Sequence, residues 1–384
     1  MESKQKKKRK AKPGQIISIL CYPLIGAVCG FLMVRYIDIV LPVRKDIGEF
    51  IYGLCICFFL LFAAFFLHII LHETGHLIFG RITGYHFMSF RIGKMMFLKK
   101  DGKIKLRRLS IAGTGGQCLM DPPDMKDGKI PFVLYNLGGS LVNFISALIF
   151  IGAYIVCPNY LYLSLFFLIM AVTGIGIALA NGIPLRFGMV DNDGNNAVSL
   201  GKSSMALYSF WVQMKMNAQM TNGVRLKDMP LEWFYQPKAD ELKNSIIAVM
   251  AVFYENRLMD EHNFEEAELQ INKLLSLDTE IAGLYKRLLI CDKIYCALLE
   301  HNRKKTVSLL QTKEHFKFVK QMKQFPAVIR TEYAAALLYE DNTAKAECIK
   351  KRFELCAKSY PYPADIESER ELMEIAEKRK DSGI

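Results

Sequence analysis

Three residues within a five-residue window, His72, Glu73 and His76, have the types and spacing of a zinc-dependent hydrolytic site. On a helix, residues four apart lie one turn apart on the same face, so both imidazoles can reach one zinc ion. Glu73 lies next to them and can accept a proton from an attacking water molecule. The pattern therefore predicts metal-assisted hydrolysis, with His72 and His76 as zinc ligands and Glu73 as the catalytic residue.

The stretch that carries these residues is unusually apolar. Residues 50–71, just before His72, are almost all hydrophobic. An acidic residue at the centre of a bilayer costs about 2.5–3.5 kcal/mol on insertion scales. Ionisable residues at such depth are therefore functional candidates by default, and the zinc motif is predicted to lie inside a membrane helix.

Other hydrophobic stretches are also long enough to cross a bilayer, which takes roughly 20 residues. The predicted spans cover about 16–36, 48–80, 133–156 and 160–183. A basic tail, residues 1–15, precedes the first of them. No small-residue cleavage site follows that first stretch, so we expect an uncleaved membrane helix and not a signal peptide.

The positive charge is distributed as in a membrane protein. A net charge of +12 is also found in proteins that bind nucleic acid. The Lys and Arg residues, however, gather in the N-terminal tail and in residues 81–130, and the connection around Cys157 has none. The positive-inside rule then predicts a multi-pass protein of the cell membrane with both termini in the cytoplasm. No nucleic-acid partner is expected.

Two carboxylates after the fourth predicted span are candidates for a third ligand. Asp191 and Asp193 follow the span on the cytoplasmic side, at the depth expected for the histidine pair. Catalytic zinc usually has three protein ligands, so either aspartate could complete the site. A solvated turn is the alternative for this stretch. His68 shares the stripe of His72 and His76, but a hydrogen-bonded core position is more common for such a residue.

A β-hairpin is predicted at residues 87–110. Two β-prone runs flank Asp101-Gly102, a dipeptide typical of tight hairpin turns. The hairpin is either a simple connector between spans or an edge strand that holds an extended substrate by strand addition. The sequence alone leaves both interpretations open.

The C-terminal half is predicted to be soluble and helical. A linker helix at 201–237 leads to a helical domain at 238–384. Similar helix starts at His262, His301 and Asp341 recur at about 39–40 residues. Tetratricopeptide repeats have a usual period of about 34, so the spacing favours a related array of helical hairpins. Such arrays bind protein or peptide partners on a concave surface. An irregular helical bundle that only stabilises the enzyme is the alternative.

The motifs together resemble the site-2 protease family of intramembrane zinc metalloproteases. His72–His76 matches the zinc motif of that family, and the hairpin with its glycine-rich end looks like the family's membrane-associated β-hairpin. Gly138–Asn143 is similar to a glycine-proline-x-x-asparagine signature, with Ser140 where proline is usual. Asn181–Pro184, followed by Asp193-Gly194, resembles the asparagine-x-x-proline and aspartate-glycine block.

The resemblance implies particular roles and an architecture. Asp193, which precedes the glycine, would be the third zinc ligand. The fold expected is mainly α: a four-span membrane core at 16–200 with a short β-hairpin, then a soluble tetratricopeptide-like domain. The gap between Asn181 and the aspartate-glycine pair is longer than usual in the family. No PDZ-like insert separates the second and third spans, so substrates must be selected elsewhere.

The sequence therefore predicts an intramembrane zinc endopeptidase that cleaves transmembrane segments or signal-peptide remnants near the cytoplasmic face. Asn143 and Asn181, amides at the ends of two spans, could bind the exposed substrate backbone, or could merely cap and pack helices. One alternative is a membrane-anchored scaffold with a structural or degenerate zinc site. Another is a membrane zincin with a glutamate as third ligand, which is disfavoured because no membrane helix after the motif carries a glutamate.

Overall fold

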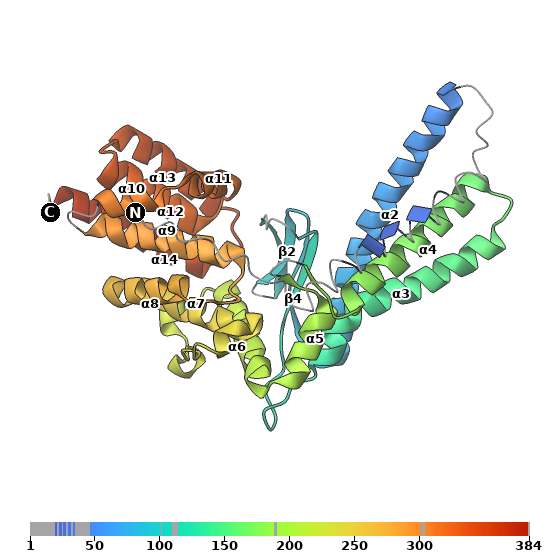
Figure 1. Ribbon diagram of the computed structural model, residues 1–384, viewed down its shortest axis with the longest axis horizontal. Coiled ribbons are helices and arrows are strands. Elements are labelled where there is room, and N and C mark those ends of the chain that lie inside the picture. Colours follow the sequence, from blue (N-terminus) through green and yellow to red (C-terminus); the bar gives the residue numbers. More distant parts are fainter. Residues whose placement is uncertain are drawn as a thin grey trace. The chain divides into compact units, whose positions relative to one another are not determined.

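The computed structural model describes residues 47–100, 102–109, 114–187, 190–300 and 304–382, with scattered residues between 20 and 34. Helices dominate the described part of the chain (Figure 1). The mainly helical class that the sequence predicted is confirmed. The predicted basic tail lies outside the described residues, and so does most of the predicted first span.

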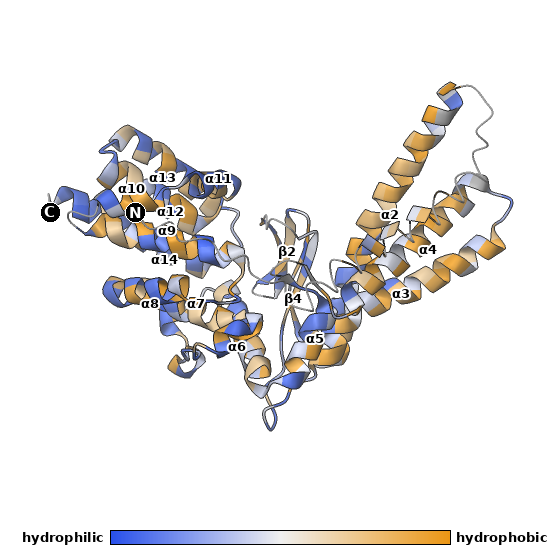
Figure 2. Cartoon of the chain, in the orientation of Figure 1, coloured by the Kyte–Doolittle hydropathy of each residue, from blue (hydrophilic) through white to orange (hydrophobic). Residues whose placement is uncertain are grey.

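Three helices are the most apolar elements of the described chain: α2 (Ile47–Ile82), α3 (Phe132–Val156) and α4 (Leu161–Gly182). Among the described residues, these three are long and apolar enough to cross a membrane (Figure 2). They correspond to the second, third and fourth predicted spans. Large side chains such as Phe58, Phe62 and Ile149 are more than 60% exposed on them. Such a surface is unusual in water but suits hydrocarbon.

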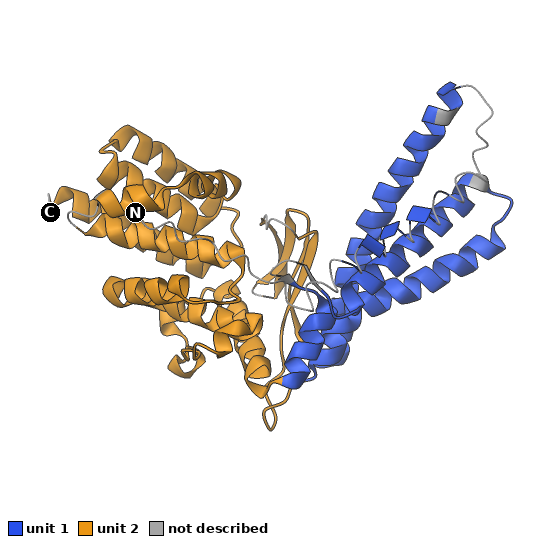
Figure 3. Ribbon diagram, viewed as in Figure 1, with its two compact units in different colours: residues 1–84, 131–202 blue, residues 85–130, 203–384 orange. Residues whose placement is uncertain are grey.

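The chain divides into two compact units (Figure 3). Unit 1 is residues 1–84 and 131–202, and unit 2 is residues 85–130 and 203–384. Unit 1 holds the three long helices, the short strands β5 (Arg186–Phe187) and β6 (Val190–Asp191), and helix α5 (Asp193–Lys202). The segment between the second and third spans therefore groups with the C-terminal half of the chain.

Glycines let α2 and α3 approach closely in unit 1. A Cβ atom on Gly75 would lie 2.2 Å from the carbonyl oxygen of Gly138, and one on Gly138 would lie 2.6 Å from that of Gly75. Real Cβ atoms do not come so near to backbone, so both positions require glycine. Small residues at helix crossings are typical of membrane helices, which associate by close packing and without a hydrophobic driving force. This crossing fixes the half of α2 that carries the histidines.

The predicted hairpin is part of a larger sheet in unit 2. Strands β1 (His86–Ile92), β2 (Met95–Lys100), β3 (Lys103–Arg108) and β4 (Gly116–Asp121) form an antiparallel sheet in the order β3-β2-β1-β4. The first of the two β-prone runs in the predicted hairpin, residues 87–98, forms two strands. Gly93, with a φ of +57°, reverses the chain there and splits the run in two. The fourth strand was not predicted, because it follows a glycine-rich segment.

The rest of unit 2 is an array of helices. In chain order they are α6 (Ser204–Thr221), η1 (Leu226–Asp228), η2 (Leu231–Trp233), η3 (Glu241–Lys243), α7 (Ser245–Asp260), α8 (Phe264–Ser276), α9 (Gly283–Leu299), α10 (Lys304–Leu310), α11 (Lys313–Gln321), α12 (Pro326–Ala334), the π-helical η4 (Ala335–Tyr339), α13 (Thr343–Ala357) and α14 (Pro363–Asp381). The helix starts predicted near 262, 301 and 341 are confirmed by α8, α10 and α13. Helix α6, in the predicted linker, packs against α7, α14 and β4.

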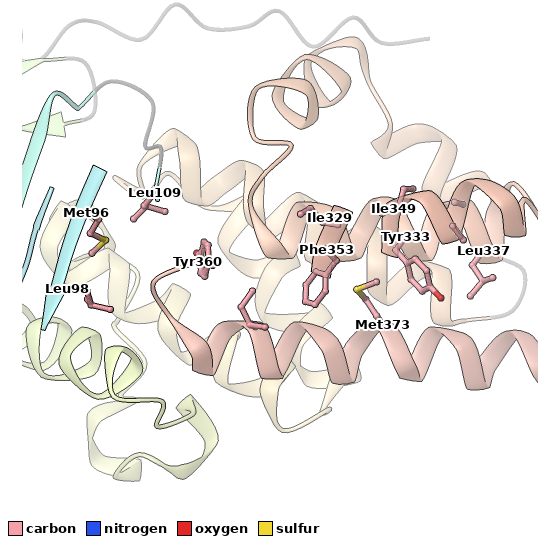
Figure 4. Packing of buried hydrophobic residues seen from close by; sticks show 13 residues of the cluster. Met96, Leu98, Leu109, Ile329, Tyr333, Leu337, Ile349, Phe353, Tyr360 and Met373 are labelled. Atoms are coloured by element: carbon pink, nitrogen blue, oxygen red, sulfur yellow. The ribbon is translucent and has the colours of Figure 1, made fainter. Parts of the chain in front are cut away.

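The sheet and the last helices share one hydrophobic core within unit 2 (Figure 4). Met96 and Leu98 of β2 are almost fully buried, and they belong to the same cluster as Phe353 and Tyr360. The opposite face of β2 and β3 carries exposed apolar side chains, for example Phe97 at 39% and Leu106 at 53%. The side chains of β2 that pack on the C-terminal helices therefore lie on one face of the sheet.

Candidate metal centre

Three side chains that could ligate a metal converge in unit 1. Nε2 of His72 lies 3.2 Å from Nε2 of His76. Oδ2 of Asp193 lies 3.0 Å from the first of these nitrogens and 3.4 Å from the second. Among the described residues, this is the one group of three or more His, Cys, Asp or Glu side chains whose ligand atoms come within 4.8 Å of one another.

The spacing of these atoms fits zinc. Bonds of 2.0–2.1 Å in a tetrahedral arrangement place neighbouring ligand atoms about 3.3 Å apart. The three distances in the structure, 3.0, 3.2 and 3.4 Å, lie close to this value. Oδ2 of Asp193 is buried and has no hydrogen-bond partner among the described residues. A buried, unsatisfied carboxylate oxygen beside two imidazole nitrogens is unfavourable unless a cation lies between them.

The second nitrogen of His76 fixes the state of its ring. Nδ1 of His76 lies 2.7 Å from the carbonyl oxygen of Tyr135 on α3. A carbonyl oxygen only accepts, so Nδ1 must carry the proton and donate it. In the neutral ring this leaves Nε2 unprotonated and facing the cluster, as a metal ligand requires.

The second nitrogen of His72 meets a buried polar chain. The amide of Asn143 on α3 lies 3.1 Å from Nδ1 of His72 and 3.1 Å from Nδ1 of His68. Nε2 of His68 donates to the carbonyl oxygen of Met170 on α4, at 2.8 Å. Both His68 and Asn143 are fully buried. His68 therefore lies outside the metal cluster, in the hydrogen-bonded core position that was the favoured expectation for it.

Glycines make room for the imidazole rings of His72 and His68. A Cβ atom on Gly139 would come within 2.5 Å of the His72 ring, and one on Gly174 within 2.6 Å of the His68 ring. Any larger residue would push the ring out of its place. Gly139 was part of a motif in the sequence, whereas Gly174 is one of several small residues in an apolar span and gave no signal.

Asn192 holds Asp193 in position. Its amide nitrogen donates to the carbonyl oxygens of Ala180 and Ile183 at the end of α4, at 2.7 and 2.6 Å. Its Oδ1 accepts from the backbone N–H of Asn195, at 2.9 Å, as an N-cap of α5. The side chain thus ties the last turn of α4 to the first turn of α5. Asn192 was not among the residues predicted from the sequence, although an asparagine before a helix start is a recognisable signal.

The structure separates the two candidate aspartates. Asp191 lies in β6 and accepts a hydrogen bond from the Asn195 amide at 2.7 Å, outside the cluster. Glu73 is buried on α2, next to His72. Asn181 donates to the carbonyl oxygen of Ile177 in its own helix, at 3.1 Å. Of the residues that the sequence singled out, the structure brings together His72, His76 and Asp193, with Asn143 directly behind them.

Comparison with known proteins gives one result. No curated protein and no solved structure matches the chain. The model of peptidase family M50 matches residues 60–254, a stretch that includes the zinc motif, Asn143, Asn181 and Asp193. With just over half of its length matched, the chain belongs to peptidase family M50, the site-2 protease family.

Proposed function

We propose that the protein is an intramembrane zinc endopeptidase that cuts transmembrane segments, or the membrane-embedded remnants of signal peptides, near the cytoplasmic face. One observation carries the proposal. His72 and His76, on a helix long and apolar enough to span a bilayer, meet Asp193 with the separations of a tetrahedral zinc site. Family membership supports peptidase chemistry for that site.

His72, His76 and Asp193 would hold the zinc, which when bound lowers the pKa of water and polarises the scissile carbonyl. Glu73 would accept the proton of the attacking water and then deliver it to the leaving amine. Its burial keeps this proton transfer away from bulk solvent. The substrate must unwind locally, because a helical backbone shields its own carbonyls.

Asn143 has a positioning role in this proposal instead of the substrate-binding role that the sequence suggested. Nε2 of His68 donates to Met170, so Nδ1 of a neutral His68 must accept from the Asn143 NH₂ group. The amide oxygen of Asn143 then faces His72 and accepts from its Nδ1, which leaves Nε2 of His72 free for the metal. The structure places Nδ2 of Asn143 toward His72 and Oδ1 toward His68, so this orientation exchanges the two amide atoms, an assignment made from the hydrogen bonds of His68. Asn181 remains the candidate for binding the substrate backbone.

Strand β3 is the proposed docking element for an unwound substrate. It lies at one edge of the sheet. The N–H of Arg108 donates to Ser359, away from β2, at 3.1 Å. Backbone groups alternate in direction along an antiparallel strand, so the N–H groups of Ile104 and Leu106 also face outward. An extended peptide could add to this edge by backbone pairing.

We extend the proposal to the membrane topology and to the C-terminal helices. The protein would be a multi-pass membrane protein with both termini in the cytoplasm. Its C-terminal helices would form a tetratricopeptide-like array that binds a protein or peptide partner.

The test is cleavage by purified protein in lipid vesicles. Glu73→Gln should remove cleavage of a labelled transmembrane peptide while stoichiometric zinc is retained, because Gln keeps the shape but cannot accept the proton. Asp193→Ala should lose zinc as well, whereas Asp191→Ala should keep both zinc and activity. Cellular function that survives Glu73→Gln would favour the scaffold alternative. Loss of zinc in Asp191→Ala alone would move the third ligand to Asp191.

A further inference from the structure

Unit 2 contains a cavity of about 380 Å³ that plays no part in the proposed cleavage reaction. Its walls come from α6, α7, α9, α12, α14, strand β4 and Leu109, and all of its lining residues belong to unit 2. Ligand sites in proteins usually measure about 300–1,000 Å³. The cavity is therefore large enough for one or two amino-acid side chains. Leu109 and Tyr360 line it at the side where the sheet meets the helices (Figure 4).

The charge of the cavity wall is strongly unbalanced. Four carboxylates and a single guanidinium line it, namely Asp260, Asp292, Asp365, Glu369 and Arg330. We call this space the acidic cavity. Arg330 is almost fully buried and pairs with Asp292 and with Glu369, the latter at 2.8 Å. Arg225, which does not line the cavity, pairs with Asp260 at 2.6 Å.

Asp365 is left without a cation. Among the described residues its hydrogen-bond partner is the Tyr360 hydroxyl, which donates to Oδ2 over a long 3.5 Å, and no Lys, Arg or His pairs with it. Burial and the neighbouring carboxylates Glu369 and Asp260 raise the pKa of Asp365 to about 8. The same electrostatic field that opposes ionisation of Asp365 attracts a positive charge into the cavity.

A second carboxylate lies in the same field. Glu255 on α7 is fully buried, and neither of its carboxylate oxygens has a hydrogen-bond partner in the described chain. The charged groups that act on it are Asp292, Glu369 and Arg330. Buried carboxylates thus outnumber the cations available to neutralise them. Such an arrangement is costly unless a cation from outside completes it.

The shape of the site favours an organic cation over a metal ion. The carboxylates of the acidic cavity form no cluster within metal-ligating distance among the described residues. Aromatic rings line it instead, including Tyr285, Phe325 and Tyr362, and ring faces bind ammonium and guanidinium groups. The side-chain amides of Asn217 and Asn256 also line it. An amide both donates and accepts, so these two can pair with a peptide backbone.

From this charge, size and lining we propose that the acidic cavity binds a lysine or arginine side chain of a peptide segment from another molecule. The ammonium or guanidinium group would face Asp365 and the aromatic rings, and the neighbouring backbone would face the two asparagines. The site gives the C-terminal helices a defined ligand class. It is independent of the zinc chemistry, since no residue of the cavity belongs to the metal centre.

The test is peptide binding to the purified full-length protein in detergent. The probe is a fluorescein-labelled Ala-Lys-Ala-Lys-Ala peptide with capped ends, followed by fluorescence anisotropy. The assay buffer contains about 0.1 M salt, because salt at this concentration screens charges that are exposed and more than about 10 Å apart. The lysine peptide should bind, and the same peptide with acetylated lysines should bind at least about tenfold more weakly, because one charged hydrogen bond is worth about that much.

Matched variants assign the binding to the cavity. At pH 9, above the Asp365 pKa of about 8, Asp365→Asn should weaken binding about tenfold, since it removes the unpaired charge with little change of shape. Ser368→Lys, which places a cation in the cavity wall, should abolish binding. Asp240→Asn, the same change at an exposed position, should bind like the parent, as should the cleavage-deficient Glu73→Gln. Parental affinity in both Asp365→Asn and Ser368→Lys would overturn the proposal.

The chain also has a basic segment of its own, residues 1–12, with seven Lys and Arg. Deletion of residues 2–12 distinguishes the two sources of the cation. Unchanged affinity for the free peptide supports a ligand from another molecule. Affinity that rises several-fold on deletion would mean that the tail competes for the cavity, and the assignment to a separate peptide would be wrong.

Discussion

The proposed metal site would depend on the groups behind its ligands as much as on the ligands themselves. Both imidazoles are held at their second nitrogen, His76 by the carbonyl of Tyr135 and His72 by the amide of Asn143. The bond to Tyr135 selects the tautomer of His76 whose Nε2 lone pair faces the cluster. The proposed orientation of the Asn143 amide would select the same tautomer for His72. Groups that support metal ligands in this way typically contribute 10–100-fold in metal affinity or activity.

Asn143→Ala should therefore weaken zinc binding by about 10–100-fold while the helices stay folded. The measurement is zinc competition with a fluorescent chelator, with circular dichroism to check helicity. Asn136→Ala is the matched control. Asn136 is also a buried asparagine of α3, but its amide donates to Phe132 in its own helix. Equal zinc affinity in the two variants would show that Asn143 does not orient His72.

Asp365 predicts a dependence of stability on pH. Its pKa is 3.8 in the reference state and about 8 in the folded protein, under the influence of burial, Glu369 and Asp260, partly offset by the Tyr360 hydroxyl. Between these values the folded state binds more protons than the unfolded state, so this group's contribution to stability falls as the pH rises from about 4 to about 8. An asparagine at this position does not ionise.

Asp365→Asn should consequently raise the melting temperature at pH 8, and less so at pH 5. A gain of about 2–4 °C corresponds to 1 kcal/mol in a domain of this size. Intrinsic fluorescence can follow it, because both tryptophans, Trp211 and Trp233, lie in unit 2. A lower melting temperature at both pH values would mean that Asp365 stabilises the fold by its own contacts.

At the scale of secondary-structure elements, the edge of β3 that faces away from β2 makes the substrate-docking proposal testable. Leu106→Pro removes an N–H that faces away from β2, so the sheet can keep its own ladder. Cleavage should fall about five- to tenfold, the effect of losing about one hydrogen bond, with zinc content unchanged. Leu106→Ala keeps the N–H and is the control for loss of the side chain. If both variants cleave at the parental rate, β3 does not hold the substrate.

At the scale of the whole molecule, the proposed orientation predicts which cysteines can be labelled from outside. Cys157 lies between α3 and α4, and Cys348 is exposed on α13. In intact cells, a membrane-impermeant maleimide should label a variant that retains only Cys157 and should spare one that retains only Cys348. Labelling of Cys348 before the cells are opened would reverse the orientation.

The sequence by itself determined the features that depend on neighbouring residues. The i, i+4 histidine pair, the apolar length of three spans, the Asp-Gly turn and the starts of α8, α10 and α13 all follow from local spacing and composition. The helix that carries the zinc motif was predictable for this reason, because its 36 residues, Ile47–Ile82, are mostly apolar.

The tertiary structure decided what depends on contacts between distant parts of the chain. Asp193, and not Asp191, meets the histidines because Asn192 ties α4 to α5. Asn143 lies between two histidines more than 70 residues away in sequence, and no local pattern shows this pairing. Strand β4 joins β1 across a glycine-rich segment, and the acidic cavity gathers residues from five α-helices. These contacts join residues that are far apart in the sequence. A local sequence pattern does not show which distant residue a side chain will meet.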